Sequence, residues 1–203
     1  MYNLHANLNN ALADGSVTAV LAAILNPNET LHPDLVLLTI LAEDPVYLDT
    51  WAEALALGAH RVTMMATDAH RNSLNFPLSD GERIDSWRRM NRWFSNHLLL
   101  PSDDGNGWDD RDLKEALRAG RLYGVFEILG YARGFDFYAE TGPQRVEMGG
   151  TARLAEGVTL RVMRPSVRGL EDAAQPSRTV RVLRATTDGW VEVARGDGDV
   201  SMT

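Results

Sequence analysis

The sequence predicts an α/β domain over residues 1–142, followed by a small β-sandwich-like module over residues 143–203. In the first part, helical periodicity alternates with apolar, strand-like runs, which is the order of elements typical of α/β folds. After residue 143 the helical periodicity disappears, and short β-type runs recur with turn signals between them. A length of 203 residues is enough for one good core, or for one core and a small module.

The composition excludes several classes of function. The formal charge of −8, from 28 acidic and 20 basic residues, argues against nucleic-acid binding, which needs a basic surface. The absence of cysteine excludes disulfides, thiolate metal sites and cysteine nucleophiles, so any metal must be held by His, Asp, Glu or backbone oxygen. No signal peptide or membrane-spanning run is visible, so we expect no membrane partner and, by default, a cytoplasmic location.

The first 41 residues predict short helical elements. A helix or helical turn covers residues 6–14, and Ser16 is placed to cap a second helix that ends at Leu25. The run 31–41 is almost wholly apolar, and its periodicity does not distinguish a buried strand from a buried helix.

Residues 44–68 predict a helix that leads into a strand. Asp44-Pro45 opens the helix and Gly58 ends it. Three side chains share one face of this helix at spacings of three and four: Leu48, Trp51 and Leu55. A strand then runs from Arg61 to Asp68 and passes into a polar loop. In α/β folds the chemistry collects at the carboxyl ends of strands, so a site is expected here.

Asp68 and His70 are the candidate metal ligands. Residues two apart on a strand point the same way, so both side chains could reach one cation where the strand becomes a loop. A carboxylate and a neutral imidazole suit Zn, Mn or Fe. The alternative is a loop aspartate that caps a turn beside a partly exposed histidine, and the pair alone does not decide between them. His60 precedes the strand at its opposite end and is expected to lie far from any site.

Residues 71–129 predict a loop over 71–81, a helix from Glu82 onward, a polar loop over 101–109, a helix over 112–119 and a strand over 122–129. The first of these helices carries an apolar stripe: Ile84, Trp87, Met90, Phe94 and Leu98. It also carries four arginines, which we expect on a solvated face, with a phosphate or a partner as the alternative: Arg83, Arg88, Arg89 and Arg92.

The remainder of the chain predicts strands. One is expected at 134–139, and the module beyond residue 143 carries further runs at 144–148, 158–163, 179–184 and 190–194. Residues 196–203 carry no closing strand. Four strands leave exposed edges, so this module is expected to be unfinished unless it pairs with something.

Together with the elements downstream, Arg61–Arg71 resembles part of the PHP (polymerase and histidinol phosphatase) metal-dependent phosphoesterases. Members of that family end their metal-binding domain with a strand that runs into a Ser/Thr-Asp-Ala-His element, which here is Thr67-Asp68-Ala69-His70. The ALRAGR helix end (Ala116–Arg121) and the GFDF element (Gly134–Phe137) are also similar, and Tyr2-Asn3 fits the end of an earlier barrel strand. The resemblance covers roughly residues 1–140, and the β-rich module is a plausible continuation.

The resemblance implies a fold, an activity and a set of site residues. The fold is a distorted seven-stranded (βα) barrel, of which this chain would hold the C-terminal part. The activity is metal-assisted hydrolysis of a phosphoester in a phosphorylated small molecule. Asp68 and His70 would be the last ligands of a site for divalent ions (Mn, Zn or Fe), with His5 as a third candidate. Arg71 is a candidate substrate-binding residue.

The departures from the family limit the expected activity. The opening His-x-His motif is absent, because no two histidines lie two apart. Two protein ligands seldom hold a catalytic metal, so we expect an incomplete site and a chain that is inactive or weakly active alone. Such a chain could also lack bound metal. Association with a missing N-terminal half, or self-association into a homo-oligomer, would complete it. The alternative is a non-enzymatic binding module, derived from a PHP domain, that recognises a protein or glycan.

Overall fold

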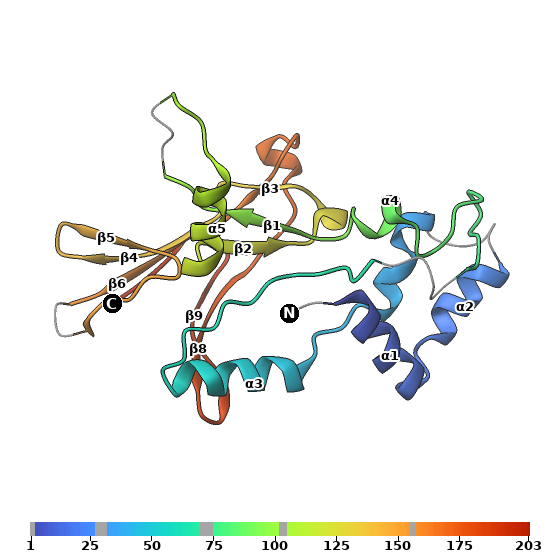
Figure 1. The fold of residues 1–203 in the computed structure, drawn as a ribbon, viewed down its shortest axis with the longest axis horizontal. Coiled ribbons are helices and arrows are strands. Elements are labelled where there is room, and N and C mark those ends of the chain that lie inside the picture. Colours follow the sequence, from blue (N-terminus) through green and yellow to red (C-terminus); the bar gives the residue numbers. More distant parts are fainter. Residues whose placement is uncertain (1–2, 27–31, 70–74, 102–104, 155–156) are drawn as a thin grey trace. The chain divides into compact units, whose positions relative to one another are not determined.

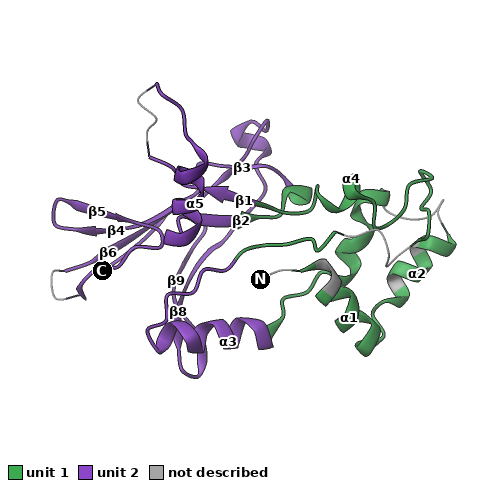
Figure 2. Ribbon diagram, in the orientation of Figure 1, with its two compact units in different colours: residues 1–45, 64–95, 124–129 green, residues 46–63, 96–123, 130–203 purple. Residues whose placement is uncertain are grey.

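The computed structural model describes residues 3–26, 32–69, 75–101, 105–154 and 157–203 (Figure 1). The chain divides into two compact units, each with its own hydrophobic cluster (Figure 2). Unit 1 comprises Met1–Pro45, Met64–Ser95 and Gly124–Leu129, and unit 2 comprises Val46–Thr63, Asn96–Tyr123 and Gly130–Thr203. The domain boundary expected between residues 142 and 143 stays a prediction.

Unit 1 is built from short helices and connecting segments. Its helices are α1 (Leu4–Asp14), α2 (Thr18–Leu25), the 3₁₀-helix η1 (Pro33–Ile40), the one-turn α4 (Trp87–Met90) and the 3₁₀-helix η2 (Glu127–Leu129). Its buried core consists of Leu8, Ala11, Val20, Val36, Leu37, Ile40, Leu78, Ile84, Met90, Trp93 and Phe94. α1 confirms the helix expected at 6–14, and α2 ends at Leu25 as expected, although no side chain caps its start.

The apolar run that was ambiguous in the sequence forms η1. Pro33 occupies the first turn, where its missing N–H leaves no hydrogen bond unmade. The His32 side chain accepts a hydrogen bond from the backbone N–H of Asp34 at 3.2 Å. Residues 33–40 are therefore neither a strand nor an α-helix, and residue 31 lies outside the described part of the chain.

The expectation of a long helix from Glu82 onward is wrong. α4 spans only four residues, begins with a hydrogen bond from the Arg89 N–H to the Ser86 side chain, and is followed by the strand β1 (Ser95–Leu98). Trp93 and Phe94 are adjacent in sequence and both buried. A long helix would leave Arg89 on its solvated face, but Arg89 is fully buried against Asp34 and Asp80, so packing in unit 1 overrides the helical periodicity.

Two α-helices belong to unit 2 within the described residues. In α3 (Pro45–Ala56), all residues but Pro45 belong to this unit, and Gly58 follows with a φ of 83°. α5 (Asp110–Ala119) starts with a capping box between Asp109 and Asp112 and ends at Gly120 with a φ of 74°. Both helices confirm the sequence expectation. None of the helices in the described residues is long and apolar enough to cross a membrane.

The strands form small antiparallel sheets. One sheet has the order β10-β6-β4-β5, from β4 (Asp136–Thr141), β5 (Gln144–Glu147), β6 (Thr159–Met163) and β10 (Val200–Met202). The others pair β8 (Val180–Thr186) with β9 (Gly189–Gly196), β3 (Ala132–Arg133) with β7 (Ser166–Val167), and β1 with β2 (Leu122–Val125). A short 3₁₀-helix, η4, covers Asp172–Ala174.

The core of unit 2 joins the four-stranded sheet to the β8-β9 hairpin. Val162 and Val200 come from the sheet and Val182 from the hairpin, and these three buried side chains form one cluster. β10 corrects the expectation that residues 196–203 carry no strand, because Val200 pairs with Val162 on β6. The strand expected at 122–129 is shorter, since β2 ends at Val125 and η2 follows.

The expectation of a (βα) barrel is also wrong. The sheets in the described residues are small and antiparallel, and none closes into a barrel. Residues 61–68, expected to be a buried barrel strand, make one isolated parallel bridge, between Ala66 and Asn3. A parallel barrel strand needs both faces covered, whereas Val62 and Met64 are partly exposed.

Candidate functional site

Asp68 lies in unit 1, beside Asn3, the residue that precedes α1. Asn3 accepts a hydrogen bond from the Ala6 N–H at its Oδ1 (3.0 Å), which satisfies a free donor in the first turn of the helix. Its Nδ2 donates to Asp68 Oδ2 at 3.4 Å. The parallel bridge between Asn3 and Ala66 brings these two segments together. Asn3 therefore both caps α1 and orients the carboxylate expected to bind metal.

The backbone of Asp68 is in the left-handed region. Its φ of 53° is the one positive value at a non-glycine residue in the described part of the chain. Aspartate tolerates this conformation better than most residues, because its short side chain bonds locally. Such positions concentrate at ligand-binding sites and turns. This conformation bends the chain two residues after the bridge at Ala66. The carboxylate of Asp68 is therefore exposed at the end of the segment 61–68.

The other predicted site residues lie wholly or partly outside the described structure. His5 belongs to α1, and its side chain lies outside what the structure describes. His70 and Arg71 fall in the segment 70–74, which also lies outside the described residues. Of the predicted ligand set, the described geometry therefore covers the side chain of Asp68, and the roles of the other three residues stay predictions.

The remaining histidines have other surroundings. His32 caps η1 through its side chain. His97 is half-buried, with its Nδ1 at 3.3 Å from the hydroxyl of Tyr123. The Nε2 of His60 lies 3.3 Å from the carbonyl oxygen of Gly149. His60 was expected to lie far from any site, but it lines a cavity in unit 2.

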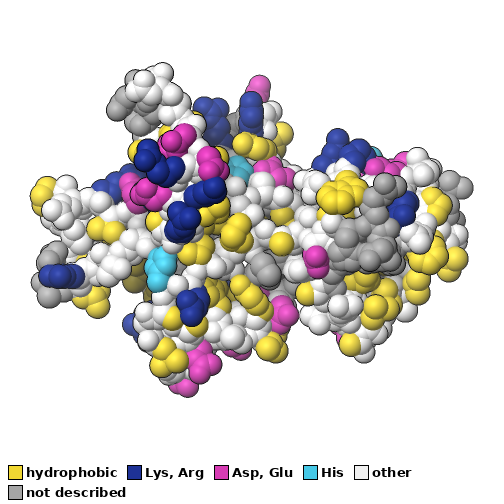
Figure 3. Space-filling view, viewed as in Figure 1, with side chains coloured by type: hydrophobic (Ala, Val, Ile, Leu, Met, Phe, Trp, Pro, Cys, Tyr) yellow, Lys and Arg dark blue, Asp and Glu magenta, His cyan; other side chains and the backbone are white. Residues whose placement is uncertain are grey.

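A network of carboxylates and arginines surrounds α4 in unit 1. Asp34, Asp80 and Glu82 each present a carboxylate oxygen, and these atoms lie within 4.8 Å of one another. Basic and acidic side chains lie side by side on this part of the surface (Figure 3). The side chain of Arg89 is fully buried and donates to Asp34 (2.5 Å) and Asp80 (2.8 Å).

Two more arginines join this network. Arg88 donates to Asp34 at 3.1 Å and to Glu82, and Arg92 donates to Asp34 at 3.0 Å. The carboxylate cluster, which on its own resembles a cation site, therefore already holds three guanidinium groups. The burial of Arg89 also corrects the expectation that the four arginines form a solvated face, because its partners lie on other segments.

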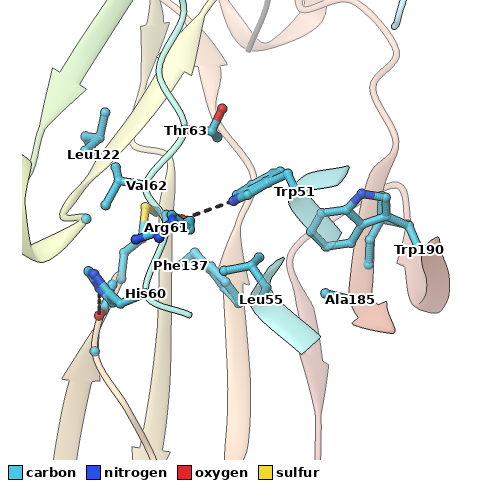
Figure 4. Close-up of a pocket in the computed structure, with 15 residues that line it drawn as sticks. Trp51, Leu55, His60, Arg61, Val62, Thr63, Leu122, Phe137, Ala185 and Trp190 are labelled. Carbon is cyan, nitrogen blue, oxygen red and sulfur yellow. Dashed lines mark hydrogen bonds between the residues drawn. The ribbon is translucent and has the colours of Figure 1, made fainter. Parts of the chain in front are cut away.

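Unit 2 contains a cavity of about 490 Å³. Figure 4 shows Trp51 from α3 beside Trp190 from β9, with ring centroids 5.0 Å apart and planes tilted by 57°. Both indole N–H groups donate to backbone carbonyls, Trp51 to Arg61 at 3.0 Å and Trp190 to Leu48 at 2.9 Å. These bonds hold the two rings in place on one wall.

The rest of the cavity lining comes from several elements. The lining is completed by Leu55, His60, Val62, Thr63, Gly120, Leu122, Phe137, Met148, Gly149, Gly150, Leu183 and Ala185, together with Arg61. Gly149 is required where it packs on the end of α5, because a Cβ there would lie 1.9 Å from the Ala119 carbonyl oxygen. The cavity thus depends on contacts between segments far apart in sequence, which no local pattern predicts.

No protein-family model, no curated protein and no solved structure matches this chain. The PHP resemblance therefore stays a prediction.

Proposed function

We propose that the segment ending at Asp68 forms part of a divalent-metal site, and that this chain takes part in metal-dependent phosphoester hydrolysis while being inactive or weakly active alone. The observation that carries the proposal is the hydrogen bond from Asn3 to Asp68, next to the parallel bridge at Ala66. In metal sites, a neighbouring hydrogen-bond donor commonly fixes the orientation of the ligating carboxylate.

The donor chemistry fits a divalent ion. Asp68 is exposed at the end of its segment, and the resemblance adds His70 as an imidazole ligand two residues on. Asn3 serves as the orienting group, since its Oδ1 is engaged by the Ala6 N–H. Asp68 and His70 together can hold an ion, but three or more protein ligands are usual at a catalytic metal, so catalysis needs further ligands.

The division of roles follows from these residues. Bound divalent ions lower the pKa of a coordinated water and neutralise phosphoryl charge. Asp68 would contribute negative charge to the site, and Asn3 would limit its rotation. Arg71, next to the proposed ligand His70, would bind a phosphate oxygen of a phosphorylated small molecule.

Hydrolysis of an aryl phosphate monoester and diester, with Mn²⁺, Zn²⁺ or Fe²⁺ added, tests this function. Activity that is weak, metal-dependent and lost in Asp68→Asn with His70→Ala supports the proposal. Asn resembles Asp in tolerating a positive φ, so the substitution removes charge with little backbone strain. Activity that persists both in the double variant and in the presence of a chelator would not come from a metal at Asp68, and it would contradict the proposal.

The second candidate is a non-enzymatic binding module. The cavity beside Trp51 and Trp190 in unit 2 favours it, because its volume falls in the range of small-molecule sites, roughly 300–1,000 Å³. Under this hypothesis the chain binds a ligand without transforming it. The substitutions at Asp68 and His70 would leave that binding unchanged.

A further inference from the structure

We propose that the cavity of unit 2 binds a small organic anion with an aromatic, apolar body, and that the acid group of this ligand pairs with Arg61. The inference rests on the second proposed function, the binding module, and is independent of a metal at Asp68. It assigns a ligand class to a site that the metal proposal does not use.

The aromatic wall selects the body of the ligand. The indole N–H groups of Trp51 and Trp190 are both engaged by backbone carbonyls, so the rings offer carbon surface instead of hydrogen-bond donors. Leu55 and Phe137 extend this apolar lining (Figure 4). Leu183 also belongs to it. Aromatic side chains favour offset or edge-to-face contact with another ring, so a planar ring system suits this wall.

The ionisable groups of the cavity are basic. Arg61 and His60 line it, and no Asp or Glu belongs to its described lining, although the chain as a whole carries a formal charge of −8. The Arg61 guanidinium makes neither a hydrogen bond nor an ion pair with any described side chain. An anion therefore finds a cationic partner here without first displacing a carboxylate.

His60 adds a second polar group beside Arg61. Its Nε2 lies 3.3 Å from the Gly149 carbonyl, which only accepts, so the hydrogen of this contact belongs to His60. A cationic ligand would meet two basic side chains in the cavity lining. The observed charges therefore favour an anion.

The polar groups are too few for a carbohydrate. Specific binding of a sugar needs partners for several hydroxyl groups, because a buried polar group without a partner is costly. The Thr63 hydroxyl is one of the few uncharged polar side-chain groups in the lining, and it already lies 2.9 Å from the hydroxyl of Tyr47. A single acid group on an aromatic body matches the lining better.

Two fluorescent probes with similar bodies and different charge test the inference. 1-Anilinonaphthalene-8-sulfonate is an anion, and N-phenyl-1-naphthylamine has the same two ring systems without the sulfonate. Binding of each to the full chain is followed by probe emission and by quenching of tryptophan fluorescence. Circular dichroism of every variant checks that the chain remains folded.

Arg61→Gln removes the charge and keeps the backbone carbonyl that accepts from Trp51. We expect it to weaken binding of the sulfonate probe about fivefold, the upper range for an exposed ion pair, and to leave the uncharged probe within about twofold. Arg184→Gln is the matched control. Arg184 is exposed on β8 between the lining residues Leu183 and Ala185, so its side chain points to the opposite face of the strand.

Ala185→Leu locates the binding, because the larger side chain fills part of the cavity and should weaken both probes. Equal binding of the sulfonate by the Arg61→Gln variant and the unsubstituted chain would overturn the anion assignment while leaving an apolar binding module in place. Failure of both probes to bind, or binding that is indifferent to Ala185→Leu, would overturn the cavity as a ligand site and with it this support for the second proposed function.

Discussion

The buried guanidinium of Arg89 donates a hydrogen bond to the carboxylate of Asp34, 55 residues away along the chain. Removing one partner of a buried pair leaves the other charge without compensation. We therefore expect Asp34→Asn to lower the free energy of unfolding by about 3 kcal/mol. Urea denaturation followed by circular dichroism measures the loss.

Arg92→Gln is the control for this network. Arg92 also pairs with Asp34, but 60% of its side chain is exposed. Exposed ion pairs contribute about 1 kcal/mol or less, so this substitution should have a small effect. Equal losses in the two variants would mean that burial of Arg89 does not determine the strength of the network.

The same carboxylates give the stability a pH dependence. Burial would raise the pKa of Asp34, but hydrogen bonds and charge from Arg88 and Arg89 outweigh it and hold the pKa below its ordinary value. The pKa of Asp80 is likewise lowered, since Arg89 outweighs the effect of burial. A pKa that is lower in the folded than in the unfolded chain stabilises the fold above the unfolded value, about 4, and this contribution is lost as the pH falls through the folded value.

Urea midpoints measured from about pH 7 down to about pH 3 should therefore fall at the acid end. The fall should be smaller in Asp34→Asn, which has one carboxylate fewer to protonate. An acid-side dependence that is identical in this variant and the unsubstituted chain would assign it to other groups.

The indole of Trp93 provides a test of core packing. Its side chain is fully buried, and its Nε1 has no hydrogen-bond partner in the described part of the chain. A buried donor without a partner costs about 1–3 kcal/mol, so Trp93→Phe should lose apolar contact but also relieve this cost. We expect a net change of less than about 1 kcal/mol, against about 3–5 kcal/mol for Trp93→Ala.

Thermal unfolding of the two Trp93 variants decides this point. If Trp93→Phe were as destabilising as Trp93→Ala, the indole N–H would be making a contact important for the fold.

Gly149 and Gly142 form a matched pair in unit 2. Both have positive φ, 80° and 56°, so alanine at either position meets similar backbone strain. A Cβ at Gly149 would also collide with the Ala119 carbonyl oxygen, whereas one at Gly142 would meet nothing within 4 Å. Gly149→Ala should therefore be more destabilising than Gly142→Ala by about 2 kcal/mol in urea denaturation. Equal losses of stability would show that the C-terminal end of α5 moves to accommodate the added Cβ at little cost in free energy.

Local signals predicted part of the fold. The start of α5 at Asp109 and Gly120 at its end define that helix from sequence alone. Short β-type runs between turn signals likewise predict β4, β5, β6, β8 and β9. Residues 61–68 have strand-like composition, but a strand also needs a partner, and only Ala66 has one. The stripe from Ile84 to Leu98 fits a helix locally, yet the burial of Arg89 against Asp34 and Asp80 favours another path.

The sites were less predictable, because they depend on contacts between distant segments. Asp68 could be singled out from its local motif, and Asn3 was noted only through the resemblance. Trp51 and Trp190 each lie in a recognisable element, but nothing in either segment indicates that they meet. The burial of Arg89 likewise depends on Asp34 and Asp80, which come from other segments.

The metal content of the purified chain tests the central proposal most directly. After equilibration with Mn²⁺ or Zn²⁺ and removal of free ions, elemental mass spectrometry gives the ions bound per chain. Asp80→Asn is the control, since its carboxylate belongs to the arginine network. We predict bound metal in the unsubstituted chain and in Asp80→Asn, and its loss in Asp68→Asn with His70→Ala. Metal content unchanged by that double substitution, or absent from the unsubstituted chain, would contradict a metal site at Asp68.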